Sequence, residues 1–405
     1  MNKKFSHILM VGIILMVLNN CTEPFEFDEK PVFESALVIE ANITDENKIQ
    51  NVIISRSFPL DTIITSKELG AQVQIIDDNG RIFNFDDMGN GNYSSNVSFA
   101  AEQNRSYMLN ITTSNGSSYI SEPSSIQAKS NIDEIFAARE FKDDSEEGVI
   151  IYLNSFDPTS KSDYYRYEYE ETYKIIVPFS SRGTEAFTVA PVPNQAVDIR
   201  LSDSISPICY STNTSRRIIQ TSTVDLEEDR VNRFPVRFIN RENFILSHRY
   251  SILVKQYVQS KEAFTYFETL NTFSSSESLF SQIQTGFLEG NISSQQNTTE
   301  KIIGFFEVTS VSEKRLFFNY EDLFPGEELP DYLIDCSLVS PPLFNEAGGS
   351  PLVSLIDANQ VDFFSIYDTS NPRNLDVFGP FLMTPAGCGD CTRFSSKIVP
   401  DFWEE

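Results

Sequence analysis

Histidine is nearly absent from this chain of 405 residues: it has two, and only His248 lies beyond the first twenty positions. A metalloprotease site built on two histidines is therefore excluded. Phosphate-binding loops, dinucleotide-binding glycine patterns, nucleophile elbows and calcium-binding loops are missing as well. We interpret His248 as a surface or packed residue. We assign no catalytic residue, no cofactor and no metal ligand to the chain.

Hydrolysis by two carboxylates is a reaction that leaves no short sequence signature. Acidic neighbours occur at 143–144, 146–147 and 227–229, all in polar segments. We interpret them as solvated surface, since charged residues in such segments are mostly exposed. A surface glycan hydrolase that uses paired carboxylates is the alternative hypothesis in the enzyme class.

Basic residues are scarce. Lysine and arginine number 31 against 58 aspartates and glutamates, which gives a net charge of −27, and no long basic run occurs. Nucleic acids and anionic lipid surfaces attract basic patches, so this balance argues against both as partners. We expect the acidity to keep an exported protein soluble; recruitment of a cationic ligand is the alternative.

The N-terminal apolar run, residues 8–18, is too short for a membrane-spanning helix. It follows a pair of lysines and is closed by Cys21 after a short polar exit, which is typical of a secretory signal. A cysteine three residues after Leu18 is typical of bacterial lipoproteins. We predict a signal peptide over 1–20, lipidation (palmitate) of Cys21, and an acidic tether over 21–34. An ordinary secretory signal with an incidental cysteine is the alternative.

Cysteine is also sparse, with five in the chain. The four that follow Cys21 are an even number in an exported protein and predict two disulfides. Closing the Cys388-Gly-Asp-Cys391 pair on itself would make a tight ring. We therefore expect Cys388 and Cys391 each to pair with Cys209 or Cys336. A four-cysteine zinc site and a thioredoxin-like redox pair are the alternatives.

Helical periodicity is rare, and short alternating strands separated by turns predominate. Residues 71–77 alternate in polarity, Asp-Asn-Gly at 78–80 is a hairpin signal, and residues 81–85 alternate again. Six or seven such strands predict an antiparallel β-sandwich of immunoglobulin or transthyretin type over 35–127. The fold class is therefore mainly β, with tandem β-sandwiches.

A second, fibronectin-III-like β-rich domain is expected over 128–330. Its segment 164–173 alternates tyrosines with charged residues, and we interpret the tyrosine face as core; a sugar- or peptide-stacking platform is the alternative. Residues 260–270 repeat at helical spacing and predict one inserted helix. Polar residues 179–215 predict long loops, and 331–405 a Cys-containing, disulfide-stapled C-terminal cap.

Several short motifs, taken in order, resemble those of a known family. The motifs are LVIEANIT (37–44), GAQVQIIDD (70–78), GNY (91–93), GNI (290–292), IGFFEV (303–308), CGDC (388–391) and PDFW (400–403). Over nearly the whole chain after Cys21, they resemble the domain of unknown function 4249 lipoproteins of the Bacteroidota.

The resemblance implies an outer-membrane lipoprotein, often encoded beside a TonB-dependent transporter, with no assigned catalytic residues. It also implies that acidic residues behind Cys21, here Glu23, Glu26, Asp28 and Glu29, direct the protein to the cell surface. We therefore hypothesise a non-enzymatic accessory of a TonB-dependent outer-membrane transporter that binds a small ligand, glycan or peptide. A structural or adhesive surface protein is the alternative.

Overall fold

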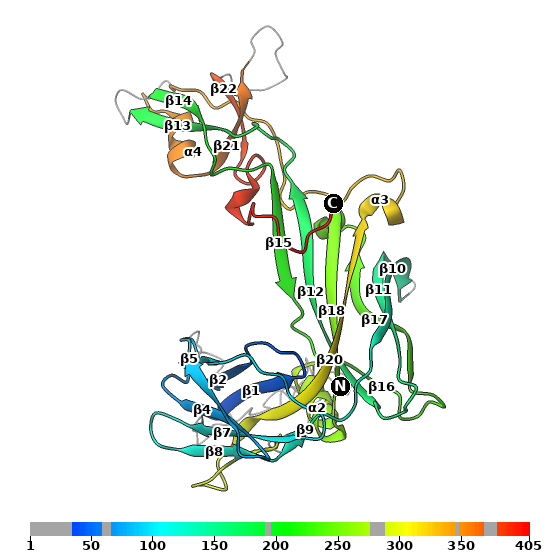
Figure 1. The fold of residues 1–405 in the computed structure, drawn as a ribbon. Helices are drawn as coiled ribbons and strands as arrows, with labels where there is room; N and C mark the ends of the chain where they lie inside the picture. The colour runs from blue at the N-terminus through cyan, green and yellow to red at the C-terminus, as the bar shows by residue number, and fades with distance from the viewer. Residues whose placement is uncertain are drawn as a thin grey trace, which may run out of the picture.

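The computed structural model describes residues 35–58, 66–143, 145–190, 196–275, 288–345, 348–367 and 379–405. Within them the protein is mainly β, as the sequence predicts. Figure 1 shows three parts: a lower sandwich, a middle part of long strands, and an upper head. In these ranges no helix has the length and apolarity that a bilayer crossing requires.

The lower part contains the first nine strands. They are β1 (Leu37–Thr44), β2 (Asn51–Arg56), β3 (Ser66–Lys67), β4 (Gln72–Asp77), β5 (Ile82–Asp87), β6 (Asn92–Ser95), β7 (Ser106–Thr112), β8 (Ser118–Ser121) and β9 (Ser124–Ser125). Their alternation buries one face, so Val73 and Ile75 of β4 enter the same core as Leu109 of β7. The predicted turn joins β4 to β5, and Gly80 adopts a φ of 79° there.

One long strand, β20 (Ile302–Asn319), belongs to both the lower and the middle part. Its first half pairs in parallel with the whole of β1, and its second half pairs antiparallel with β18 (Arg249–Val258). β19 (Ile292–Ser294) also joins the lower part, where it pairs with β8. The expected first domain, which closed at residue 127, is therefore completed by strands from much later in the chain. Such pairing leaves no trace in local sequence patterns.

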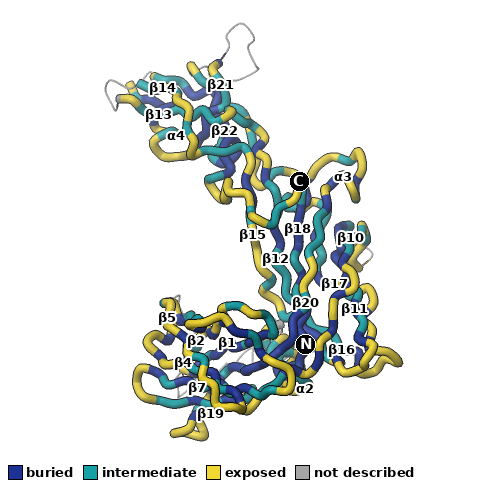
Figure 2. Tube along the Cα trace, in the orientation of Figure 1, coloured by how far each residue is buried: buried dark blue, intermediate teal, exposed yellow. Residues whose placement is uncertain are grey.

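Two sheets form the middle part. Its further strands are β10 (Ile132–Lys142), β11 (Glu146–Phe156), β12 (Tyr164–Ile176), β15 (Ile208–Thr214), β16 (Ile219–Ser222) and β17 (Arg230–Asn240). β10, β11 and β17 make one sheet, and the others continue the large sheet of the lower part through β20. Tyr165 and Tyr167 of β12 are fully buried in the shared core, which confirms this part of the tyrosine face as core, and Tyr169 and Tyr173 are partly buried against it. Figure 2 shows buried backbone along the long strands of the middle part.

The predicted helix forms as α2 (Lys261–Ser275), at the junction of the lower and middle parts (Figure 1). The Ser260 hydroxyl accepts a hydrogen bond from the Ala263 N–H at 3.2 Å and so caps the first turn. Ala263 and Tyr266 are buried against the sheets. Elsewhere in the described ranges, the helical elements are α3 (Tyr320–Leu323), α4 (Pro351–Asp357) and 3₁₀ turns at Phe244–Leu246 and Cys391–Arg393.

The head combines two distant stretches of chain. β13 (Thr184–Ala190) pairs with β14 (Ala196–Leu201), and β21 (Val361–Ile366) pairs with β22 (Phe381–Pro385). The prediction of long loops over 179–215 is wrong, because β13, β14 and β15 lie there. These strands bury few side chains, so they need little of the apolar alternation that reveals a strand.

Two disulfides staple the upper half of the molecule, as predicted. Cys209 of β15 is bonded to Cys391, and Cys336 to Cys388. The two cysteines of the Cys-Gly-Asp-Cys segment thus belong to different bridges. Because all four sulfurs are oxidised, the zinc and redox alternatives do not fit this structure.

Candidate functional site

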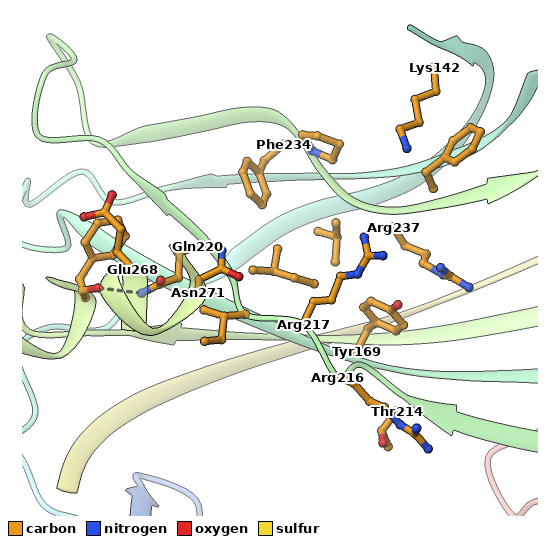
Figure 3. A pocket seen from close by; sticks show the side chains of 16 residues that line it. Lys142, Tyr169, Thr214, Arg216, Arg217, Gln220, Phe234, Arg237, Glu268 and Asn271 are labelled. Atoms are coloured by element: carbon orange, nitrogen blue, oxygen red, sulfur yellow. Dashed lines mark hydrogen bonds between the residues drawn. The ribbon is translucent and has the colours of Figure 1, made fainter. Parts of the chain in front are cut away.

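A cleft of about 740 Å³ opens on the middle part, and four of the residues that line it are basic (Figure 3). We call it the cationic cleft and define it by Lys142, Arg216, Arg217 and Arg237. Its walls come from the end of β10, from β17, from the segment between β15 and β16, and from α2. It therefore lies where the edges of the two sheets of the middle part face each other.

The segment that carries the two adjacent arginines leaves the large sheet between β15 and β16, both of which pair with β12. Ser215 holds its start, since its hydroxyl accepts from the Tyr169 N–H at 3.0 Å. Successive residues of an extended chain point in opposite directions. Accordingly, Arg217 reaches into the space below Phe234, whereas Arg216 lies on the side of Thr214 (Figure 3).

The charge of this lining is opposite to that of the whole chain. Glu268 is the single acidic residue among the lining residues. Arg237 donates from Nε and Nη2 to the Glu171 carboxylate at 3.1 and 3.2 Å. Within the described residues, neither Arg216 nor Arg217 forms an ion pair or donates a side-chain hydrogen bond, and both are exposed. Two guanidinium groups are therefore available to an anion.

Aromatic rings accompany the basic groups. Phe234 stacks on the buried Tyr167 at 5.0 Å, and the Lys142 ammonium lies 5.4 Å from the ring of Phe238. Tyr169 is half-buried, and burial raises the pKa of its hydroxyl while the neighbouring Arg237 opposes that shift. The hydroxyl is thus neutral at physiological pH and able to donate as well as accept.

A chain of polar contacts leads from the cationic cleft to the lower part. Gln220 donates to Gln259 at 2.7 Å, and also to the Phe264 carbonyl at 3.3 Å, the dashed line of Figure 3. Gln259 donates to Glu307 at 2.9 Å, and Arg166 donates to the other oxygen of Glu307 at 2.6 Å. These contacts connect β16, the end of β18, β20 and β12 beneath α2.

Arg166 is the buried cation in this series of polar contacts. Besides Glu307 it pairs with Glu168, and its guanidinium lies 4.6 Å from the Tyr257 ring and 5.3 Å from the Phe267 ring. Burial alone would lower the pKa of Arg166, but the two carboxylates outweigh burial and raise it. Arg166 is therefore a permanent charge, held between the large sheet and α2.

A second cleft, of about 570 Å³, lies on another face of α2. Phe267 and Leu270 of the helix line it, whereas Phe264 and Glu268 line the cationic cleft. Residues of β1 and β20 line it, and so do Arg166, Glu168 and Glu307. Since these acids already neutralise the arginine, this cleft offers apolar surface more than free charge.

The remaining predicted residues lie elsewhere. Cys21 is outside the described residues. His248 lines neither cleft, and its pKa is lowered by burial and then by Lys174. The interpretation of 227–229 as solvated surface is wrong for Asp229, which is buried and accepts from the Tyr165 hydroxyl at 2.7 Å. No group of three potential metal ligands occurs among the residues that the structure describes.

The cationic cleft is not evident from the sequence alone. Arg216-Arg217 is a visible basic pair in an acidic chain, but Lys142 and Arg237 are far from it in sequence. The strand pairings that bring them together are long-range. The local pair was the one available signal.

Comparison with known families adds one result. The model for the domain of unknown function DUF4249 matches residues 22–315. The chain belongs to the DUF4249 family. Both clefts and the polar chain beneath α2 lie within the matched range, while most of the C-terminal head lies outside it. No curated protein matches this DUF4249 chain.

Proposed function

We propose that this DUF4249 protein is a non-enzymatic lipoprotein of the outer membrane that captures a ligand at the cell surface for a TonB-dependent transporter. The observation that carries the proposal is the cationic cleft, whose unpaired guanidinium groups and aromatic rings are typical of binding surfaces. Because the cleft lies at a sheet edge, a ligand can reach it without disturbing the apolar cores.

The lining of the cleft favours binding over hydrolysis. Glu268 is the single carboxylate there, whereas glycoside hydrolysis by two carboxylates requires a second one about 5–10 Å away. The acidic pairs considered from sequence do not line it. Among these, Glu147 is engaged by Arg139 and Arg241 in ion pairs at 2.6 and 3.0 Å.

The N-terminal sequence supports the proposed cellular location. A signal-like run, Cys21 and an acidic tether over 21–34 support export, lipidation and display on a tether. The family match begins at residue 22, directly after the proposed lipidated cysteine. The tether would hold the clefts away from the membrane surface.

Fractionation of cells that produce the wild-type protein and Cys21→Ala tests this proposal. We expect the wild type in the outer-membrane fraction, and we expect it to co-purify with a β-barrel transporter after solubilisation. Cys21→Ala should lose both properties, because lipid chains supply the anchor. Asn20→Ala, which keeps the cysteine, is the matched control.

Two results would contradict the proposal. The first is a Cys21→Ala protein that stays with membranes after a high-salt wash. The second is a wild-type protein that migrates alone, without a barrel protein, in mild detergent.

A further inference from the structure

We propose that the cationic cleft binds an acidic oligosaccharide, with its carboxylate or sulfate groups on Lys142, Arg217 and Arg237 and its rings against the aromatic side chains. This inference rests on the ligand-binding function proposed above and names the ligand class. It follows from the charge, the layout and the strand edges of the cleft.

The charge of the cleft selects an anion. A protein with a net charge of −27 repels anions over most of its surface. Four basic residues and a single acid, Glu268, line the cleft, and Glu171 compensates Arg237 alone. A ligand with several negative groups therefore gains attraction from this cleft.

The basic groups differ in how they are held. Arg237 is fixed by its two bonds to Glu171, which in turn accepts from the Tyr250 hydroxyl at 2.6 Å. Arg217 is unpaired and can adjust to the ligand. Lys142 stands at the far end of the cleft from α2 (Figure 3). Arg237, Arg217 and Lys142 therefore provide three positive groups along the cleft. This arrangement suits an extended ligand with repeated negative charges.

The opposite end of the cleft offers two amides and one carboxylate. Gln220 lies there beside Asn271 and Glu268 of α2 (Figure 3). Among the described residues, both side-chain hydrogen bonds of Gln220 use Nε2, which leaves Oε1 to accept from a ligand hydroxyl. Between the two ends, the cleft is lined by the partly buried rings of Phe234 and Tyr169, and aromatic rings of this kind can pack against sugar rings. Hydroxyl, ring and acid recognition therefore occur in one cleft.

The strand edges of the cleft argue against an extended peptide. Peptides usually join an exposed sheet edge by adding a strand. β17 is irregular here, because Pro235 has no N–H and Arg233 has a φ of 49°. The other border is interrupted at residues 215–218, between β15 and β16. Neither edge provides a continuous ladder.

Isothermal titration of the full-length protein tests the inference. The probes are hexagalacturonate, a sulfated heparin hexasaccharide, neutral maltohexaose and hexaglutamate. We expect at least one acidic hexasaccharide to bind, maltohexaose to bind at least about tenfold more weakly, and affinity to fall with added salt. Arg217→Gln should weaken binding by about tenfold, the effect of one charge-assisted contact.

Lys161→Gln is the matched control, because Lys161 is exposed, lies outside the cleft and carries the same charge. It should bind like the wild type, and circular dichroism should show both variants folded. Binding of neither acidic sugar, equal loss in both variants, or equally tight binding of hexaglutamate would overturn the inference. Co-purification with a transporter is measured separately, so a failed titration leaves that part of the proposed function standing.

Discussion

At the scale of single residues, the buried pair Arg166–Glu307 explains how the lower and middle parts are joined. Glu307 lies in the half of β20 that pairs with β1, and Arg166 lies in β12 of the middle part. Their relative exposures are 3% and 9%. A charge buried to this degree is tolerated when it is paired, and removing one partner exposes the desolvation cost of the other.

Glu307→Gln should therefore lower the free energy of unfolding by about 3 kcal/mol, near the low end for a broken buried pair because Glu168 still faces Arg166. Urea denaturation at neutral pH measures this loss. Glu102→Gln is the control, since Glu102 pairs with Arg81 on the surface, where both side chains are about half exposed. That pair should contribute less than about 1 kcal/mol, and equal losses in the two variants would contradict this view.

The local alternation of residues in β12 predicted the burial of one face of the strand but not the burial of Arg166 on the other face. The burial of Tyr165 and Tyr167 follows from the spacing of the tyrosines in segment 164–173. The same spacing placed Arg166 on an outer, charged face. That face is covered by α2 and β20, which come much later in the chain, so no local pattern could reveal the burial of Arg166.

At the scale of elements, the sequence predicted those elements that neighbouring residues specify, and it did not predict those that depend on contacts with distant parts of the chain. The hairpin at 78–80 and the helix α2 are specified by neighbouring residues, and both were predicted. β20 is specified by its pairing with β1 and β18, and the head strands by contacts between distant stretches. Sequence patterns report burial periodicity but not partners, so these arrangements required the structure.

Gly304 of β20 tests how closely this shared strand approaches β1. A Cβ at Gly304 would lie 2.3 Å from the Ile39 carbonyl oxygen, and one at Gly290 would lie 1.7 Å from the Gly304 oxygen. We expect Gly304→Ala to lower the free energy of unfolding by more than about 2 kcal/mol, because the backbone must move apart. Thermal and urea unfolding measure the effect.

Gly116→Ala provides the comparison for Gly304→Ala. Gly116 has a φ of 88° with nothing within 4 Å of a Cβ, so this change tests backbone strain without a clash. It should be destabilising by about 1 kcal/mol. A Gly304→Ala protein as stable as Gly116→Ala would show that β20 and β1 are less tightly paired.

At the scale of the whole molecule, the head is the part with the smallest core. Its buried apolar cluster is Leu352, Val361, Phe363 and Met383, in contrast to the large cores of the two sandwich parts. Covalent ties therefore matter most here. Asp362 organises the turn that carries two of the cysteines, since it accepts from the Gly387 N–H at 2.7 Å and from Arg393 at 2.7 Å.

The two disulfides should each stabilise the head by about 2–4 kcal/mol, because they close loops between residues 182 and 52 positions apart. We expect the purified protein to contain no alkylatable thiol among these four cysteines before reduction. Non-reduced peptide mapping should link Cys209 to Cys391 and Cys336 to Cys388. Four free thiols, bound zinc, or a Cys388–Cys391 link would contradict this pairing. Reduction should then melt the head first, because its small core lacks the burial that holds the two sandwich parts together.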